Sequence, residues 1–309
     1  MANQSTGTVL LAGAANLSVA AAKLVGGLLS GSAAMLAEGA HSIADTLNQA
    51  FLLTALKRSR KPADTRHPFG YGKERYFWSM LAAVGIFVLG AGFSVLEGVE
   101  SILHPEPLTS LVVVYSVLGA SFVFEGVSWL KALRQLRSEA KESSEGTVDH
   151  LLSTAEPASK TVAFEDTAAL VGIVLAAVGV TLHYVTGQAF WDGAASITIG
   201  LLLVGVAYAL GRENKSLLIG QALPEQVRAG IAEVIEGSPG IDTVVELLTM
   251  QLAPDEVLVA AKIDLVDESS GADHEENADE VERRVRERFP EVLHVFLDPT
   301  RAPDVETHA

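Results

Sequence analysis

The chain has 309 residues, 49% of them hydrophobic, and no cysteine, which excludes disulfides and thiolate metal ligands. Its net charge is −16, and residues 213–309 carry 22 Asp and Glu against 8 Lys and Arg, so most of the acidic excess lies in the C-terminal tail. Such a tail lacks the basic surface that nucleic-acid binding requires, and we expect no nucleic-acid partner.

Six long apolar blocks precede the tail, and each is long enough to cross ~30 Å of hydrocarbon as a helix. The sequence therefore predicts an α-helical membrane protein with a six-helix transmembrane domain over residues 1–215. The predicted segments are Thr8–Leu29, Ala33–Leu56, Tyr76–Leu103, Leu108–Leu136, Thr161–Thr186 and Phe190–Leu210.

Loop charge predicts the orientation of these segments. Lys and Arg concentrate after the second, fourth and sixth segments, whereas the opposite loops around 30–32, 104–107 and 187–189 carry neither. Because basic loops stay on the cytoplasmic side, both termini are expected in the cytoplasm. The N-terminus has no Lys-rich stretch and no clear cleavage site, so we expect the first segment to be retained in an inner or plasma membrane.

The second segment carries a polar face that organises the prediction. Glu38, His41, Asp45 and Asn48 are spaced by three or four residues, so they line one side of a helix. Placing a charged residue at bilayer depth costs about 2.5–3.5 kcal/mol on insertion scales, so such residues face a protein interior and have a partner. His41 and Asp45 have the spacing to hold one divalent ion, although a polar pair that joins two helices is the alternative.

The fifth segment supplies a second acidic group, Glu165 followed by Asp166. Consecutive helical residues point about 100° apart, so both carboxylates cannot aim at one centre without distortion. One turn before Asp166 stands Val162, which cannot ligate a metal. Three ligands are clear, His41, Asp45 and Asp166, and the fourth is water, Glu165 or a group from another helix.

Other polar residues have open roles. Lys23 either lines an interior cavity or extends to the membrane interface, and Glu125 serves either an ion pathway or helix packing. Asp192 is expected to cap its own helix, the sixth segment. In the loop after the second segment, Asp64 and His67 either hold a cation weakly or belong to a solvated loop.

The tail, residues 216–309, reads as a small cytoplasmic α+β domain of αββαβ order, ferredoxin-like or metallochaperone-like, with two helices covering one face of a sheet. Its core is small, so dimerisation would help to stabilise it. The predicted elements are a helix over Pro224–Glu236, strands over Ile241–Leu252 and Val257–Val266, a helix over Ala272–Phe289 and a strand over Val292–Leu297.

Together these features resemble the cation diffusion facilitator family of divalent metal/proton antiporters, over nearly the whole chain. The matching residues are Ser30-Gly31-Ser32, Glu38 to Asp45, the loop His67-Pro-Phe-Gly70-Tyr-Gly72-Lys-Glu74, Asp166 and Asp192 to Ser196. The resemblance implies a homodimer and a tetrahedral transport site formed by the second and fifth helices. It places His41, Asp45 and Asp166 in that site, with Val162 in the place of a frequent His and Glu165 as the substitute.

Two further sites of the family look incomplete in this chain. In the loop site, Asp64 and His67 match, but the third ligand position is Tyr71. In the tail, positions expected to hold metal ligands are Val245, Lys262 and Phe296, and only Asp298 matches, so no zinc cluster is expected there.

We therefore expect a secondary transporter, not an enzyme, that exports a divalent metal from the cytoplasm in exchange for protons by alternating access. No prosthetic group is expected. One imidazole with two or three carboxylates leaves zinc, iron, manganese, cobalt and nickel open, with zinc favoured. The alternative is a membrane-embedded metal sensor or scaffold that binds metal without moving it. A membrane metallohydrolase is a third hypothesis, although no nucleophile or oxyanion-hole motif accompanies the site.

Overall fold

The computed structural model describes residues 6–142, 157–266 and 271–301. The chain divides into two compact units, one of Met1–Arg60 with Glu74–Lys215 and one of Lys61–Lys73 with Ser216–Ala309. The loop between the second and third helices thus packs with the C-terminal part of the chain. The division at residue 215 that the sequence suggests stays a prediction.

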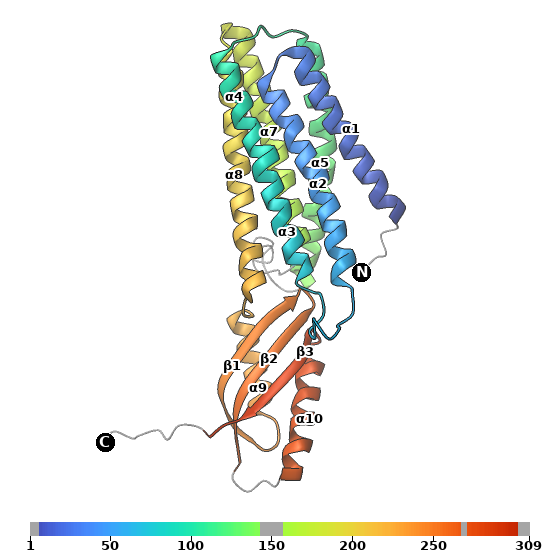
Figure 1. The fold of residues 1–309 in the computed structure, drawn as a ribbon, viewed down its shortest axis with the longest axis vertical. Helices are drawn as coiled ribbons and strands as arrows, with labels where there is room; N and C mark the ends of the chain where they lie inside the picture. Colours follow the sequence, from blue (N-terminus) through green and yellow to red (C-terminus); the bar gives the residue numbers. More distant parts are fainter. Residues whose placement is uncertain (1–5, 143–156, 267–270, 302–309) are drawn as a thin grey trace, which may run out of the picture. The chain divides into compact units, whose positions relative to one another are not determined.

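The first unit is a bundle of long helices (Figure 1). A seven-residue π-helical stretch, η1, joins α3 and α4, so these three elements form one continuous helix. Short π-helical stretches are usually found inside α-helices in this way. The elements are α1 (Thr6–Ser30), α2 (Ala33–Ser59), α3 (Glu74–Gly85), η1 (Ile86–Gly92), α4 (Phe93–Leu103), α5 (Leu111–Glu142), α7 (Pro157–Thr186) and α8 (Phe190–Ile219).

Four stretches of the described residues are long and apolar enough to cross a membrane: Glu74–Leu103, Leu111–Ser138, Phe164–Thr186 and Phe190–Ile219. They contain most of the third to sixth predicted segments. Among the residues of α1 whose side chains the structure describes, the apolar stretch is Asn16–Ser30, which is shorter, and α2 is long but carries charged residues on its polar face and near its C-terminal end. For these two helices, membrane crossing stays a prediction.

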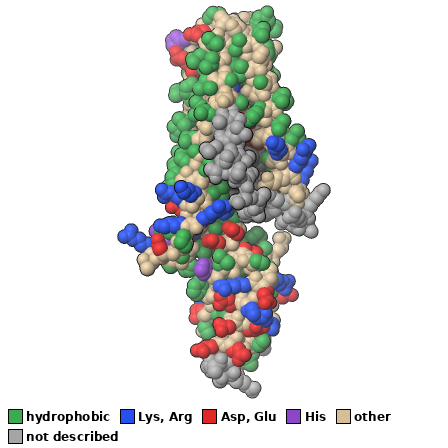
Figure 2. All heavy atoms as spheres, turned by 90° about the vertical axis from the view of Figure 1, so that its right-hand side faces the viewer, with side chains coloured by type: hydrophobic (Ala, Val, Ile, Leu, Met, Phe, Trp, Pro, Cys, Tyr) green, Lys and Arg blue, Asp and Glu red, His purple; other side chains and the backbone are tan. Residues whose placement is uncertain are grey.

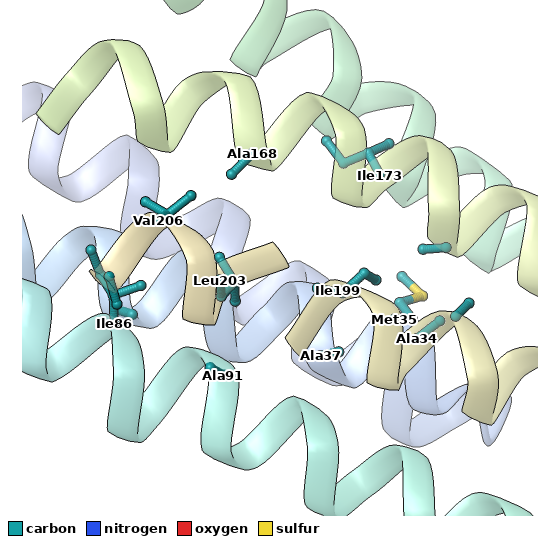
Figure 3. Close-up of a cluster of buried hydrophobic side chains, with 14 of the residues drawn as sticks. Ala34, Met35, Ala37, Ile86, Ala91, Ala168, Ile173, Ile199, Leu203 and Val206 are labelled. Carbon is teal, nitrogen blue, oxygen red and sulfur yellow. The ribbon is translucent and has the colours of Figure 1, made fainter. Parts of the chain in front are cut away.

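Apolar side chains lie both inside the bundle and on its surface, as expected of a helical unit surrounded by lipid. Within it, α2, η1, α7 and α8 contribute a cluster of buried side chains that includes Met35, Ile86, Ile199 and Leu203 (Figure 3). Figure 2 shows hydrophobic side chains over much of the visible surface of this unit. Since lipid offers no hydrophobic drive between helices, close packing must hold them together.

Glycine provides that close packing where α4 crosses α8. A Cβ at Gly98 would lie 2.6 Å from the carbonyl oxygen of Gly193 and 2.9 Å from the amide nitrogen of Ile197. A Cβ at Gly193 would lie 2.6 Å from the carbonyl oxygen of Gly98. The two backbones are therefore in direct contact, which any larger residue at either position would prevent.

The second unit confirms the predicted αββαβ order. Its elements are α9 (Glu225–Glu236), β1 (Ile241–Ala253), β2 (Glu256–Leu265), α10 (Gly271–Arg288) and β3 (Val292–Pro299). The strand order is β1-β2-β3, with β1 and β2 antiparallel and β2 and β3 parallel. The core packs the alternate residues of β2 against apolar residues of both helices, as the period of two and the helical period predict. It includes Ile231, Ile235, Val257, Val259, Val281 and Val285.

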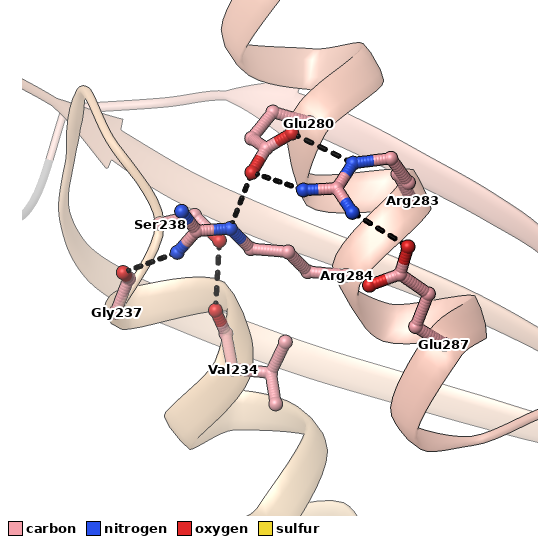
Figure 4. A network of polar contacts seen from close by, with 7 residues as sticks. All are labelled: Val234, Gly237, Ser238, Glu280, Arg283, Arg284 and Glu287. Atoms are coloured by element: carbon pink, nitrogen blue, oxygen red, sulfur yellow. Dashed lines mark hydrogen bonds and ion pairs between the residues drawn. The ribbon is translucent and has the colours of Figure 1, made fainter.

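Charged side chains join the two helices of this unit (Figure 4). Glu280 accepts hydrogen bonds from Arg283 at 2.7 Å and from Arg284 at 2.6 Å. Arg284 in turn donates to the carbonyl oxygen of Gly237 at the end of α9, at 3.0 Å. The two arginines hold the pKa of Glu280 at about 2, below its ordinary value.

The loop Lys61–Lys73 contacts the sheet of the same unit. The ring of Phe69 meets the rings of His294 and Phe296 edge-on, with centroids 5.2 and 6.3 Å apart. A Cβ at Gly72 would lie 2.7 Å from the Cβ of Ala253, so this loop approaches the β1–β2 turn closely. The aromatic and glycine residues of the loop thereby fix its position on the sheet.

Candidate metal site

The polar face predicted for the second segment is present on α2 and is buried. Glu38, His41 and Asn48 are at most 1% exposed. The side chain of Asp45 is 15% exposed, and its Oδ1 lies 3.4 Å from Nδ1 of His41. One helical turn thus separates each of these residues from the next, and all four face the interior of the bundle.

On α7 the two consecutive acids point to different helices, as their position in one helix requires. Glu165 is buried and faces α2, where Nδ2 of Asn48 donates a hydrogen bond to its Oε2 at 2.6 Å. Asp166 accepts a hydrogen bond from Oγ of Ser128 on α5 at 3.0 Å. The carboxylate that α7 directs toward the polar face of α2 is therefore that of Glu165.

Several buried polar atoms on these two facing helices have no hydrogen-bond partner in the protein. They include both ring nitrogens of His41, Oδ1 of Asp45, Oδ1 of Asn48, Oε1 of Glu165 and Oε1 of Glu38. Leaving a buried polar atom unpaired costs about 1–3 kcal/mol, so several of them on facing helices suggest that something polar binds there. Imidazole nitrogen with carboxylate and amide oxygen is a donor set suited to a divalent metal ion.

In the described parts of the chain, however, no three His, Asp or Glu side chains lie close enough together to enclose a metal ion. The expected convergence of His41, Asp45 and Asp166 on one point is therefore not seen in this conformation. The reason is that Ser128 holds Asp166 toward α5, while Asn48 holds Glu165. The side chain of position 162 lies outside the described residues, so the consequence of Val162 is not visible.

A group that the sequence did not pair lies beside this site. Lys23 of α1 is fully buried, and its Nζ lies 3.0 Å from Oε2 of Glu38 and 2.9 Å from Oγ of Ser42. Of the two roles predicted for Lys23, extension to the membrane interface is therefore wrong. A Lys within an Ala- and Gly-rich apolar segment indicates that the residue has a buried acidic partner. The sequence does not identify this partner, because the pairing depends on how α1 packs on α2.

The expectation that Asp192 caps its own helix is also wrong. Its carboxylate accepts hydrogen bonds from Oγ of Ser32 at 2.8 Å and from the amide of Ala33 at 2.5 Å. Asp192 therefore caps the N-terminus of α2, although Asp192 and Ser32 are 160 residues apart in the sequence. Asp192 is fully buried, because the packing of α8 against α2 encloses the carboxylate where the free amides of α2 begin.

The loop pair Asp64 and His67 is engaged by protein groups. Asp64 accepts hydrogen bonds from the hydroxyl of Tyr71 at 2.7 Å and from the amides of Arg66 and His67 at 2.9 and 2.8 Å. The Tyr71 hydroxyl and the His67 amide hold the pKa of Asp64 well below its ordinary value. The ammonium of Lys61 lies 3.7 Å from Asp64. The ammonium of Lys61 thus already provides a positive charge beside the carboxylate of Asp64, which favours a structural role for the loop.

In the tail, Lys262 donates to Glu246 at 2.7 Å, and this hydrogen bond raises the pKa of Lys262. The ring of Phe296 is half exposed and contacts Phe69. Neither of these positions offers a metal ligand. Val245 and Asp298 occupy the other two of the four positions where the resemblance implies metal ligands. That the tail holds no zinc cluster stays a prediction.

Comparison with known families covers both units. The profile described as "Cation efflux transmembrane domain" matches residues 9–219, and the profile described as "Cation efflux protein, cytoplasmic domain" matches residues 223–298. The chain belongs to the cation efflux family. This match confirms the resemblance to the cation diffusion facilitators that the sequence predicts. Members of this family are transporters and not enzymes. With its apolar helices, this family member is a multi-pass membrane protein.

Individual relatives point the same way. The chain is 33% identical over 243 residues to "Proton-coupled zinc antiporter SLC30A9, mitochondrial" of Homo sapiens, covering 78% of this chain and 43% of that protein. It is 34% identical over 235 residues to "Metal tolerance protein C4" of Arabidopsis thaliana, covering 76% of this chain and 51% of that protein. This family member therefore spans about half the length of these relatives.

Proposed function

We propose that this protein exports a divalent transition metal, zinc foremost, from the cytoplasm in exchange for protons. The observation that carries the proposal is the set of unpaired buried nitrogen and oxygen atoms shared by α2 and α7. Membership of a family of cation efflux transporters supports movement of the ion and not only its binding. The name of the human relative, a proton-coupled zinc antiporter, supports both zinc and proton exchange.

The proposed ligands are His41 and Asp45 from α2 and Glu165 from α7, with Asp166 as the fourth residue of the site. Glu165 replaces Asp166 as the first ligand from α7, because Glu165 faces α2 and Asp166 faces α5. Asn48 positions Glu165 through its 2.6 Å hydrogen bond. Exchanging the two acids would need α7 to rotate by about 100°, so in this proposal Glu165 stays the acid that faces α2.

Proton exchange follows from the chemistry of these ligands. An imidazole must be neutral and a carboxylate ionised to bind metal, so protons and metal compete for the same atoms. Protons arriving from the outer side displace the metal there, and loss of protons to the cytoplasm restores the site. In this proposal both termini are cytoplasmic, and the protein lies in an inner or plasma membrane as a homodimer.

The test is zinc flux with accompanying proton movement in proteoliposomes. Asp45→Ala and Glu165→Ala should each lower the initial rate at least tenfold, and Asp166→Ala should lower it less than Glu165→Ala does. Glu100→Gln is the matched control, since Glu100 is 66% exposed at the outer end of α4 and pairs with an exposed His104.

Wild-type rates for both Asp45→Ala and Glu165→Ala would show that the site is misassigned. Tight zinc binding without flux in the wild-type protein would favour the sensor or scaffold instead.

A further inference from the structure

Lys23 occupies a position that resembles that of a bound cation. Its Nζ lies 2.9 Å from Oγ of Ser42, 3.0 Å from Oε2 of Glu38 and 3.9 Å from Oε1 of Glu125. The side chains of Lys23 and Glu38 are fully buried, and that of Glu125 is 15% exposed. Oxygen atoms from α2 and α5 thus surround an ammonium group contributed by α1.

Glu38 is the residue of the buried polar face of α2 that lies one turn before His41. It lies three residues before His41 on the same face of α2, so the two side chains are neighbours. Its Oε1 has no hydrogen-bond partner and lies against α7 where Gly172 lacks a side chain. One oxygen of Glu38 is therefore held by Lys23, while the other is buried and unpaired between α2 and α7.

We propose that Lys23 is a tethered cation that keeps Glu38 out of the ligand set and thereby sets the metal selectivity. This inference rests on the proposed function and deepens it. With Glu38 bound to the ammonium, the site holds one imidazole and two or three acids, which suits zinc. With Glu38 released, a further carboxylate oxygen becomes available, and oxygen-rich sites favour harder ions such as manganese.

Lys23 acts through Glu38, so it is a positioning residue and not a ligand. Its removal should change which metal is preferred, and not merely the stability of the bundle. The ammonium is also a compact charge, which differs from the planar guanidinium of arginine but carries the same sign. Lys23→Arg therefore separates the loss of the positive charge from the loss of the lysine's particular shape.

The experiment measures competitive binding of Zn²⁺ and Mn²⁺ to the full-length protein in detergent, and flux of both ions in proteoliposomes. In Lys23→Met the preference for Zn²⁺ over Mn²⁺ should fall at least tenfold. In Lys23→Arg the preference should stay within about threefold of wild type, because the charge remains. In the double variant Lys23→Met with Glu38→Gln it should also return to within about threefold, since no carboxylate is released.

Glu38→Gln alone provides a measurement that does not depend on the folding of Lys23→Met. Because Glu38 is not a ligand in the wild-type protein, this variant should bind Zn²⁺ with an affinity within about threefold of wild type. Asp45→Asn should lower that affinity at least tenfold in the same assay.

Three results would overturn the inference: an unchanged metal preference in folded Lys23→Met, a lost preference that persists in the double variant, or a tenfold loss of Zn²⁺ affinity in Glu38→Gln. An unchanged affinity in Asp45→Asn would instead contradict the proposed metal site. The failure of the inference and the failure of the proposed function are therefore distinguishable.

Discussion

Replacing Asp192 should destabilise the start of α2, although Asp192 lies on a different helix. Its two carboxylate oxygens accept from Oγ of Ser32 and from the amide of Ala33, at 2.8 and 2.5 Å, and the side chain is fully buried. Asp192→Asn keeps the size of the side chain and one acceptor oxygen, whereas Asp192→Ala removes both acceptors. The two substitutions should therefore have graded effects.

The magnitude follows from the number of hydrogen bonds lost. Hydrogen bonds to a charged group contribute about 1.5–3 kcal/mol each to stability. Asp192→Asn should cost about one such bond, and Asp192→Ala should cost up to twice as much. For a unit of this size, 1 kcal/mol corresponds to about 2–4 °C, so Asp192→Asn should lower the melting temperature by about 3–12 °C.

The assay is the thermal stability of the purified protein in detergent, followed by size-exclusion chromatography after heating. Glu100→Gln serves as a control, because the exposed pair that Glu100 forms with His104 should contribute less than about 1 kcal/mol. Hydrogen exchange at Ala33 and the residues after it should accelerate in Asp192→Ala. If Asp192→Ala and Glu100→Gln melt within 2 °C of each other, about 1 kcal/mol or less, the capping argument is wrong.

Two further predictions concern a helix crossing and the tail. Gly98→Ala places a methyl group against the backbone of α8 and should lower the stability by about 1–3 kcal/mol. Gly119→Ala is the control, because a Cβ at Gly119 would have no atom within 4 Å. This substitution should be neutral or stabilising in the same melting assay. The pKa of Glu280 is lowered to about 2 by Arg283 and Arg284, so its contribution is full above pH 4.5 and is lost toward pH 2. Exchange protection of α10 should therefore fall less over this range in Glu280→Gln than in wild type, and equal losses would contradict this.

Local patterns determined a large part of this protein. Hydrophobic blocks of membrane length indicated the helical unit, and the spacing of His41 and Asp45 placed them on one face of α2. Helical periodicity in two segments and β-rich runs in the others predicted the αββαβ order of the tail, which the structure confirms. These features depend only on residues close together in the sequence, because the period of a helix or a strand is a property of the local backbone.

What the sequence left open were contacts between helices that are distant along the chain. The rotation of α7 decides that Glu165 faces Asn48 while Asp166 faces Ser128. Periodicity predicted that the two acids diverge, and the sequence favoured Asp166 as the ligand that joins His41 and Asp45, whereas Glu165 is the acid that faces α2. Interhelical packing sets that rotation, and packing depends on side chains from several helices at once.

The tertiary structure likewise chose the partners of the buried charges. Lys23 pairs with Glu38 across α1 and α2, and Asp192 caps a helix that begins 159 residues earlier in the chain, at Ala33. A buried charge is strongly destabilising unless it is paired, so the sequence shows that a partner must exist. Only the packed arrangement of the helices shows which one it is.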